Sequence, residues 1–312
     1  MNITDKLFSI FTRDVVLFVT TLLTGVVIAR YLGPEKMGIW TLLLLIPGYA
    51  EAFGRLQLDT SSVYFIGKGK IKLGEVAFIL HLVSMIMVSV IALVGFLNID
   101  FLHNQIFENV EMDVQEFIYG VFLIIPLRFI YINYSYLLIA REEIKAYNKL
   151  IIIQALTTSV LSVGMIILMD FGILGALIGN VLGLLVSIIY GIAKVDSIDK
   201  IRPNFNTSLI IKMAKYSAYL YVNGLIRFFQ NNIGVLIAAY YVTPAQIAFF
   251  ALGKSISEIS TRMVPAAVNT ILFPRVSSSH DEKGAIELVA RSFRVTLLII
   301  STTTVILFFL IT

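Results

Sequence analysis

The sequence predicts an all-α integral membrane protein of about nine transmembrane helices, from its composition, its apolar segments and the placing of its positive charges. Of the 312 residues, 58% are hydrophobic and only 14% are charged. The mean hydropathy is +0.89. A soluble domain carries about 25% charged residues. A water-soluble fold could not bury so much apolar surface, so lipid must be the main solvent of this chain.

Composition also excludes several classes of site. The chain has no cysteine, which excludes disulfides, thiol chemistry and thiolate metal sites. Its three histidines, His81, His103 and His280, are scattered without metal-ligand spacing. The formal net charge is +4, but the basic residues recur in short hydrophilic gaps and do not form one patch. We therefore expect no metal, no cofactor and no nucleic-acid partner.

Nine segments are long and apolar enough to cross a bilayer, which takes roughly 20 residues. The first is too long for a removable signal peptide and lacks a small-residue cleavage site. A lead-in at Leu209–Lys215, before the seventh segment, is expected to lie along the membrane surface. The gaps between segments are too short for a separate soluble domain. The expected spans are 11–32, 39–58, 75–97, 117–140, 150–170, 173–193, 216–241, 247–271 and 292–311.

The positive charges alternate between the two sides of the membrane. Seventeen of the 24 Lys and Arg residues fall in alternate gaps, starting with the N-terminal segment. The opposite gaps hold only Arg30 and Lys36, and the opposite gap 98–116 is acidic. Cytoplasmic loops are the ones rich in Lys and Arg. The sequence therefore predicts a cytoplasmic N-terminus, and a missed or false span would have disrupted the alternation.

Five cations remain inside the expected spans, and they are the candidate substrate-binding residues. Each costs roughly 2.5–3.5 kcal/mol at a helix centre, so we expect them to face the bundle interior or a water-filled cavity. A surplus of positive charge attracts anions, and the guanidinium group suits phosphate. Asn231 adds a neutral donor, which suits either sugar hydroxyls or hydrogen bonds between helices. The five cations are Arg55, Arg128, Arg227, Lys254 and Arg262.

Two spans carry a charged stripe at the spacing i, i+4, i+8, which places three side chains on one face of a helix. The stripes either line a shared cavity or form salt-bridge ladders satisfied within each helix. Their carboxylates, Glu51, Glu258 and Asp59, are the candidates for coupling transport to an ion. The stripes are Glu51, Arg55 and Asp59 in the second span and Lys254, Glu258 and Arg262 in the eighth.

Two hairpins about 210 residues apart are similar in sequence. Val26–Tyr31 is followed by Pro34, and the matching run 235–240 is followed by Pro244. An even number of spans separates the hairpins, so the two copies share one orientation. Parallel repeats of this kind occur in transporters, with the substrate path between the halves. The alternative is chance similarity between apolar hairpins.

Small residues and prolines predict where helices pack closely or bend. Gly175, Gly179 and Gly183 recur every four residues in the sixth span, which permits close packing against a neighbour. Proline within a helix removes a backbone donor and kinks or ends the helix. The prolines at such positions are Pro47, Pro126, Pro265 and Pro274.

The run from Ala29 to Trp40 resembles a signature of bacterial polysaccharide transporters, in which the first span ends in a similar Arg-x-Leu-Gly-Pro run. These are the O-antigen and exopolysaccharide flippases, of the superfamily that also holds the multidrug and toxin extrusion (MATE) exporters and the lipid II flippases. The resemblance implies a MATE-like fold of two six-helix bundles around a central cationic cavity. On that pattern, residues 1–205 form one bundle, and residues 206–312 form the first three helices of a second, incomplete bundle.

The resemblance also implies a function. The expected substrate is an undecaprenyl-pyrophosphate-linked oligosaccharide, flipped across the bacterial plasma membrane, with membrane lipids and other polysaccharide-assembly proteins as partners. The alternatives are a MATE-like multidrug exporter coupled to H⁺ or Na⁺, a membrane enzyme such as a polymerase or ligase, and a scaffold without transport activity. An exporter of organic cations predicts an acidic cavity, and an enzyme of this kind usually has a large outer loop. Neither feature is present in the sequence, so we expect a transporter and not an enzyme.

Overall fold

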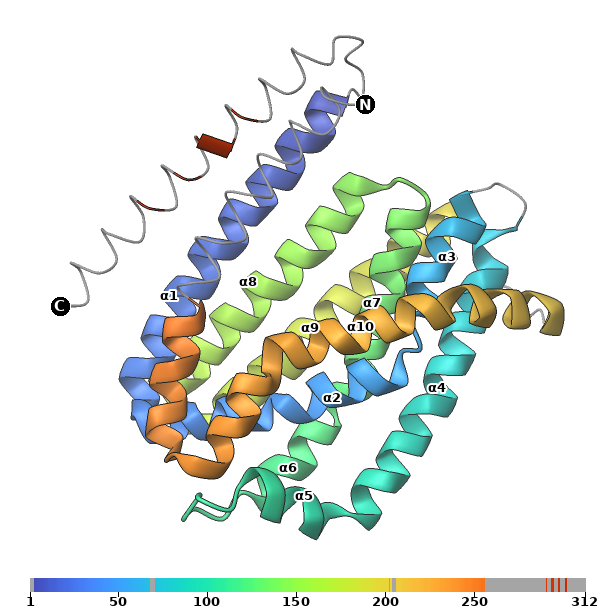
Figure 1. Ribbon diagram of the computed structural model, residues 1–312. Coiled ribbons are helices and arrows are strands. Elements are labelled where there is room, and N and C mark those ends of the chain that lie inside the picture. Colours follow the sequence, from blue (N-terminus) through green and yellow to red (C-terminus); the bar gives the residue numbers. More distant parts are fainter. Residues whose placement is uncertain are drawn as a thin grey trace. The chain divides into compact units, whose positions relative to one another are not determined.

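The computed structural model describes residues 3–67, 71–201, 203 and 206–255, with residues 290, 293, 294, 297 and 301. All regular structure in these residues is helical. The chain divides into two compact units, one of residues 19–250 and another of residues 1–18 with 251–312. The larger unit contains most of the described helices (Figure 1). The helices are α1 (Ile3–Leu43), α2 (Leu45–Gly54), α3 (Leu58–Gly67), α4 (Leu73–Leu97), α5 (Ile99–Ile106), α6 (Gln115–Phe122), α7 (Ile124–Ala140), α8 (Ile144–Met169), α9 (Gly172–Ile198) and α10 (Thr207–Tyr241).

Five segments of the described chain are long and apolar enough to span a membrane. They overlap the first six expected spans, because the first two fall in one segment, Thr12–Gly54, which ends four residues before the expected end of the second. The seventh expected span lies in α10, which is helical but less apolar than the five segments above. The expected surface lead-in is not a separate segment, because it is the first part of this continuous helix. The eighth is described only as far as residue 255, and the ninth falls almost wholly outside the described residues.

Proline bends these spans at the predicted Pro47 and Pro126, and Gly33 adds a bend beyond those predicted. Within α1, Gly33 has φ 76° and ψ 167°, a conformation that favours glycine, and Pro34 follows it. α1 ends at Leu43, four residues before Pro47, and α6 ends at Phe122, four residues before Pro126. Each proline lacks the N–H that would bond the carbonyl four residues earlier, and its ring clashes with that carbonyl. The first pair of expected spans and the fourth span are therefore bent helices.

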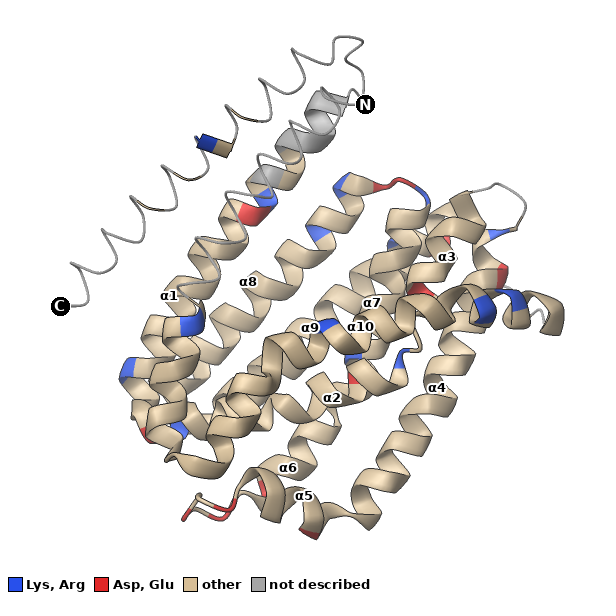
Figure 2. Cartoon of the chain, viewed as in Figure 1, with Lys and Arg blue, Asp and Glu red and all other residues tan. Residues whose placement is uncertain are grey.

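Lipid-facing surfaces of the larger unit are apolar. Leu93 and Leu97 on α4, Val160 and Leu168 on α8 and Ile189 on α9 are all more than 60% exposed. Single exposed apolar residues are normal on a soluble monomer, but exposed leucine, valine and isoleucine side chains recurring along several helices are typical of a lipid-facing surface. Most of each helix lacks charge, while a group of basic and acidic residues lies in the middle of the bundle beside α2 and α10 (Figure 2). The fold thus shows both a lipid-facing exterior and a charged interior.

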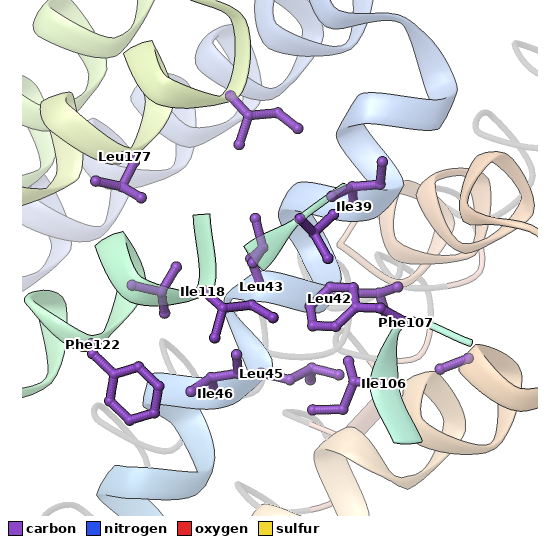
Figure 3. Close-up of a cluster of buried hydrophobic side chains, with 14 of the residues drawn as sticks. Ile39, Leu42, Leu43, Leu45, Ile46, Ile106, Phe107, Ile118, Phe122 and Leu177 are labelled. Atoms are coloured by element: carbon purple, nitrogen blue, oxygen red, sulfur yellow. The ribbon is translucent and has the colours of Figure 1, made fainter. Parts of the chain in front are cut away.

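Among the described residues, three buried apolar clusters lie within the larger unit, and two of them are large. The first joins α1 and α2 with α5, α6, α7 and α9 (Figure 3). It also includes Val235 and Ala239, which lie in the second copy of the hairpin repeat, and Ile247. In this cluster Gly38 lies directly against the backbone of Pro244, so the two hairpins are in contact. The second cluster joins α3, α4, α7, α8 and α9 with the start of α10. α10 contacts both α2 and α3, and a polar cavity lies in that interface.

Candidate functional site

A cavity of about 560 Å³ lies between α10 and the second span. The volume is within the range of roughly 300–1,000 Å³ found for small-molecule sites. One wall comes from α2 and the start of α3, with Tyr136 of α7, and the opposite wall comes from one face of α10. The lining residues are Leu44, Leu45, Gly48, Glu51, Ala52, Arg55, Gln57, Thr60, Tyr136, Leu220, Asn223, Gly224, Arg227, Phe228, Asn231 and Asn232.

The second span is broken at the cavity wall. α2 ends at Gly54 and α3 begins at Leu58, and Leu56 and Gln57 between them have φ of 51° and 54°. Left-handed conformations are rare for residues other than glycine, and each costs of order 1–3 kcal/mol. The expected helix 39–58 therefore does not run unbroken to residue 58, and the span continues to Gly67. The expectation that Glu51, Arg55 and Asp59 form one helical stripe is wrong because of this break.

Two of the predicted cations are paired with predicted carboxylates. Arg128 of α7 forms an ion pair with Glu51 of α2, whose side chain is 15% exposed. Arg55 donates from Nε to Asp59 Oδ2 at 2.8 Å and lies 5.5 Å above the ring of Tyr136. Asp59 is only 3% exposed. The alternative of a salt-bridge ladder within one helix is therefore correct for one pair only. Arg55 and Asp59 pair within the second span, whereas Glu51 pairs with Arg128 of another span.

Arg227 differs from these two arginines. It lines the cavity from α10, and in the described part of the chain it has no carboxylate partner. The charged lining residues are Glu51, Arg55 and Arg227. Counting the two ion pairs as neutral, Arg227 leaves the cavity with one surplus positive charge among the described residues. The cavity is thus suited to an anion.

Neutral polar groups surround Arg227 on the cavity face of α10. Asn223 precedes it by four residues and Asn231 follows it by four, a spacing that places all three on one helix face. Opposite, the hydroxyl group of Thr60 donates to the side-chain oxygen of Gln57 at 2.8 Å. The sequence indicated Asn231 but not Asn223, Gln57 or Thr60. The interval of four residues from Arg227 was the signal that could have found Asn223, whereas Gln57 and Thr60 reach the cavity only because of the break.

Aromatic rings and a glycine bring α10 against the second span. Tyr49 packs edge-on to Phe228, with ring centroids 5.0 Å apart. The hydroxyl group of Tyr221 donates to the carbonyl oxygen of Phe53 at 3.2 Å, close to the break. A Cβ added at Gly224 would lie 2.7 Å from Nε2 of Gln57, so glycine permits this close approach. These contacts fix α10 beside the broken segment.

Three predicted site residues fall outside the larger unit or outside the described residues. Lys254 belongs to the other compact unit, where it takes part in an interaction of its own. Glu258 and Arg262 lie outside the described residues, as do Pro265 and Pro274. Within the described residues, no group of three or more His, Cys, Asp or Glu side chains could hold a metal ion. The described part of the site is therefore made by Arg55 and Arg227, with their carboxylate and amide neighbours. Arg128 is not among the lining residues and reaches the cavity wall through its ion pair with Glu51.

Comparisons with known proteins agree with this architecture. A family model described as "Polysaccharide biosynthesis protein" matches residues 3–280. No curated protein sequence matches the chain significantly.

Among solved structures, the chain is similar to a mutant form of the Vibrio cholerae MATE transporter VcmN, with a TM-score of 0.62 and 16% identity over 95% of this chain and 68% of that one. It is also similar to the MATE transporter ClbM in complex with Rb⁺, with a TM-score of 0.66 and 14% identity over 98% of this chain and 70% of that one. A eukaryotic MATE transporter, AtDTX14, matches with a TM-score of 0.60 and 17% identity over 94% of this chain and 69% of that one.

Proposed function

The chain belongs to the polysaccharide biosynthesis protein family, and from this premise we propose that it flips an undecaprenyl-pyrophosphate-linked oligosaccharide across the bacterial plasma membrane. It is a multi-pass membrane protein with the MATE transporter fold, a transporter and not an enzyme. The identity of the substrate is the proposed step. The observation that carries it is a cavity inside the membrane protein with a surplus cation and a row of neutral amides.

Arg227 is the proposed principal contact for the pyrophosphate. A guanidinium group matches phosphate oxygens with two parallel hydrogen bonds, and such charge-assisted bonds are stronger than neutral ones. Arg55 lines the same cavity, and Arg128 is joined to the cavity wall through Glu51. A pyrophosphate entering the cavity would compete with the carboxylates for these two arginines. Arg227 has no such competitor in the described chain, so it binds first in this proposal.

The sugar is proposed to contact the amides beside Arg227. Asn223, Asn231 and Asn232 line the cavity with Gln57, and amides can both donate to and accept from hydroxyl groups. Tyr136 and Phe228 supply apolar ring surface on opposite walls. The polyprenyl tail stays in the bilayer while the head group crosses. A polar head and an apolar tail are thus matched by a polar cavity inside a lipid-facing exterior.

Topology and domain organisation complete the proposal. The alternation of Lys and Arg supports a cytoplasmic N-terminus. Residues 1–205 are proposed as one six-helix bundle and residues 206–312 as the opening helices of a second. Lys254 is proposed to bind the pyrophosphate with Arg227, and Arg262 and Arg55 to act at the inner mouth. Membrane lipids and other polysaccharide-assembly proteins are the proposed partners.

A multidrug exporter coupled to H⁺ or Na⁺ is the second candidate, because the solved structures with this fold are MATE transporters. Export of organic cations requires a carboxylate that can form an ion pair with the transported cation. In the described cavity the lining carboxylate, Glu51, is already paired with Arg128. The charge of the cavity therefore favours an anionic substrate over a cationic drug.

The test is flipping of a fluorescent lipid-linked oligosaccharide by the full chain in proteoliposomes. We expect Arg227→Gln to reduce the flipping rate at least about tenfold, the equivalent of roughly 1.4 kcal/mol of lost binding to the transported state. Lys215→Gln is the matched control, because Lys215 lies on the same helix and does not line the cavity. Wild-type flipping by Arg227→Gln, or transport of cationic dyes without lipid-linked oligosaccharide, would contradict the proposal.

A further inference from the structure

A second hollow, of about 370 Å³, lies where α3 meets the start of α10, and the proposed function does not use it. Its volume is also within the range of roughly 300–1,000 Å³ found for small-molecule sites. Tyr64 and Phe65 line it from α3, and Asn206, Ser208 and Lys212 line it from α10 and the residue before it. Among the described residues Lys212 forms no ion pair, and none of those lining this hollow (the Lys212 pocket) is acidic.

The Lys212 pocket and the 560 Å³ cavity around Arg227 (the Arg227 cavity) lie along the same face of α10. Lys212, Tyr216 and Leu220 follow one another at intervals of four residues, which places them on one helix face. Lys212 lines the pocket and Leu220 lines the cavity, so Tyr216 lies between the two. At 1.5 Å per residue, Lys212 is about 22 Å from Arg227 along the helix axis. The two hollows are therefore successive positions along one helix.

α3 repeats this alignment on the opposite wall. Thr60 lines the Arg227 cavity, and Tyr64, one turn further on, lines the Lys212 pocket. The ring of Tyr64 stacks on that of Tyr216, with centroids 4.5 Å apart and planes at 13°. Phe65 meets Tyr216 edge-on at 6.0 Å. A pair of stacked rings, one from each helix, thus lies between the pocket and the cavity.

The two ends of the Arg227 cavity are closed in different ways. Toward the end of α10, Ala239 is 5% exposed within a buried apolar cluster, and Gly38 lies against the backbone of Pro244. Toward the Lys212 pocket, Tyr64 and Tyr216 are 38% and 42% exposed. Opening the first end requires separation of packed backbones, whereas exposed side chains change rotamer within nanoseconds. The end at the Lys212 pocket is therefore the easier entrance.

The side chains of the Lys212 pocket suit a phosphate that carries a sugar. An ammonium group binds phosphate as a point charge, without the fixed geometry of a guanidinium group. The side-chain oxygen of Asn206 accepts from the backbone N–H of Leu209 at 3.1 Å, which leaves its amide nitrogen able to donate to a ligand. Ser208 adds a hydroxyl group. The pocket thus combines one cation with neutral donors.

Lys212 belongs to the Lys- and Arg-rich gaps from which a cytoplasmic N-terminus is proposed. Basic pockets between membrane helices on the cytoplasmic side bind the head groups of anionic lipids. Both a phospholipid and a lipid-linked sugar present phosphate at this depth. The alignment with the Arg227 cavity favours the lipid-linked sugar, because only this lipid continues into that cavity in the proposed function.

We propose that the Lys212 pocket is a loading site for the diphosphate head group of the lipid-linked sugar, and that the rings of Tyr64 and Tyr216 separate to admit it to the Arg227 cavity. Lys212 holds a phosphate oxygen by charge alone. Arg227 then replaces it with two parallel charge-assisted hydrogen bonds, so the head group passes from a weaker to a stronger site. This inference rests on the proposed flippase function and adds to it a second binding site and a route.

The first test locates binding by the full chain in phosphatidylcholine nanodiscs. The probe is a sugar linked through a diphosphate diester to a short photoreactive citronellyl chain. Arg227→Gln should still bind the probe, more weakly than the wild type, and photolabelling should fall on the peptides that contain Tyr64 and Ser208. Adding Lys212→Gln should weaken the remaining binding at least about tenfold, as expected for one hydrogen bond to a charged group.

Flipping kinetics in proteoliposomes separate loading from passage. Lys212→Gln should raise the substrate concentration for half-maximal flipping at least about tenfold and leave the maximal rate near that of the wild type. Arg227→Gln should lower the maximal rate. Lys215→Gln is the matched control, because Lys215 is exposed on the same helix and lines neither hollow. Equal effects of the two lysine variants would overturn the loading site.

Phosphatidylglycerol distinguishes the two sources of phosphate. We expect photolabelling of the Lys212 pocket to persist when phosphatidylglycerol is added to the nanodiscs, because a diphosphate carries more charge than a single phosphodiester. Loss of the label on this addition, with wild-type flipping by Lys212→Gln, would assign the pocket to a phospholipid and overturn the proposal.

Cysteine chemistry tests the passage between the rings, because the chain has no cysteine of its own. In Tyr64→Cys combined with Tyr216→Cys, a reducible bis-maleimide that joins the two thiols should stop flipping, and cleavage by a reductant should restore it. N-ethylmaleimide, which modifies both thiols without joining them, should slow flipping less. Flipping that continues across the joined pair would overturn this route.

The two proposals fail in different ways. Probe binding that disappears in Arg227→Gln and is unchanged in Lys212→Gln would overturn the loading site and leave the flippase assignment intact. Absence of probe binding by the wild type and by both variants would overturn the substrate class and the loading site together.

Discussion

The interface between α8 and α9 and the interface between the second span and α10 use opposite chemistry within one membrane protein. In the first, Gly175, Gly179 and Gly183 of α9 all lie against α8, so the prediction of close packing there is confirmed. In the second, a broken helix, three charged residues and a cavity of about 560 Å³ separate the two walls.

The difference follows from what holds helices together in lipid. Apolar side chains gain little from contacting each other instead of lipid, so permanent contact requires small residues that let backbones approach. Charged side chains need a polar cavity or a partner. The glycine interface is therefore suited to a rigid scaffold, and the charged interface to a site that changes during transport. Four substitutions test this division, from the largest expected effect to the smallest.

Removing Arg55 should have the largest effect on stability. Arg55→Gln leaves the 3% exposed Asp59 without its ion partner, and breaking a buried pair in this way costs about 3–5 kcal/mol. Asp59→Asn should cost less, because Arg55 also lines the large cavity and can turn toward it. Denaturant unfolding followed by fluorescence of the single tryptophan, Trp40, gives both values. Equal losses for the two variants would contradict the asymmetry, and the double variant measures the coupling between them.

Gly179→Ala, which adds one methyl group to the glycine interface, should have the next largest effect on stability. A Cβ at Gly179 would lie 2.5 Å from the backbone nitrogen of Ser162, which cannot move without displacing α8. Overpacking of this kind costs about 1–3 kcal/mol. Gly164→Ala is the matched control on α8, where a Cβ meets nothing within 4 Å and stability should hold or rise. An unchanged unfolding midpoint in Gly179→Ala would show that this interface is not rigid.

The same substitution in the charged interface should cost much less. A Cβ at Gly224 would be 2.7 Å from Nε2 of Gln57 and 3.3 Å from Cδ, the far end of a flexible side chain. We expect Gly224→Ala to change the free energy of unfolding by less than about 1 kcal/mol but to slow flipping, because Gln57 must move into the cavity. Parallel unfolding and flipping assays separate the two effects. A loss of stability as large as that of Gly179→Ala would mean that the two interfaces are equally rigid.

Removing one hydrogen bond beside the break should have the smallest effect. Tyr221→Phe deletes the donor to the carbonyl oxygen of Phe53 while keeping the ring. Polar bonds between membrane helices average about 0.6 kcal/mol, and a loss of that size in the unfolding free energy is expected. Tyr219→Phe serves as control, since Tyr219 is 77% exposed on the same helix. A loss above about 2 kcal/mol would make Tyr221 a main support of the broken segment.

Much of the fold could be predicted from local sequence. Lipid selects long apolar helices, and proline and glycine bend helices by covalent geometry alone, so the bends at Gly33, Pro47 and Pro126 follow from the residues present. The break at Leu56 and Gln57 could not be predicted, because neither residue favours a left-handed conformation. A local ion pair between Arg55 and Asp59 spans the break. The tertiary contact at the break is the approach of α10 at Gly224.

The sequence by itself determined that this chain is a helical membrane protein with arginines inside its membrane-spanning helices, because apolar length and charge position are properties of the chain alone. Only the tertiary structure decided which of those arginines are paired. Ion pairing depends on distances between residues far apart in sequence, as for Glu51 and Arg128, and on which side of a broken helix an acid faces, as for Asp59. For that reason the sequence alone could not distinguish the cations from one another. Packing pairs Arg55 and Arg128 with carboxylates, and it leaves Arg227 as the surplus charge of the described cavity.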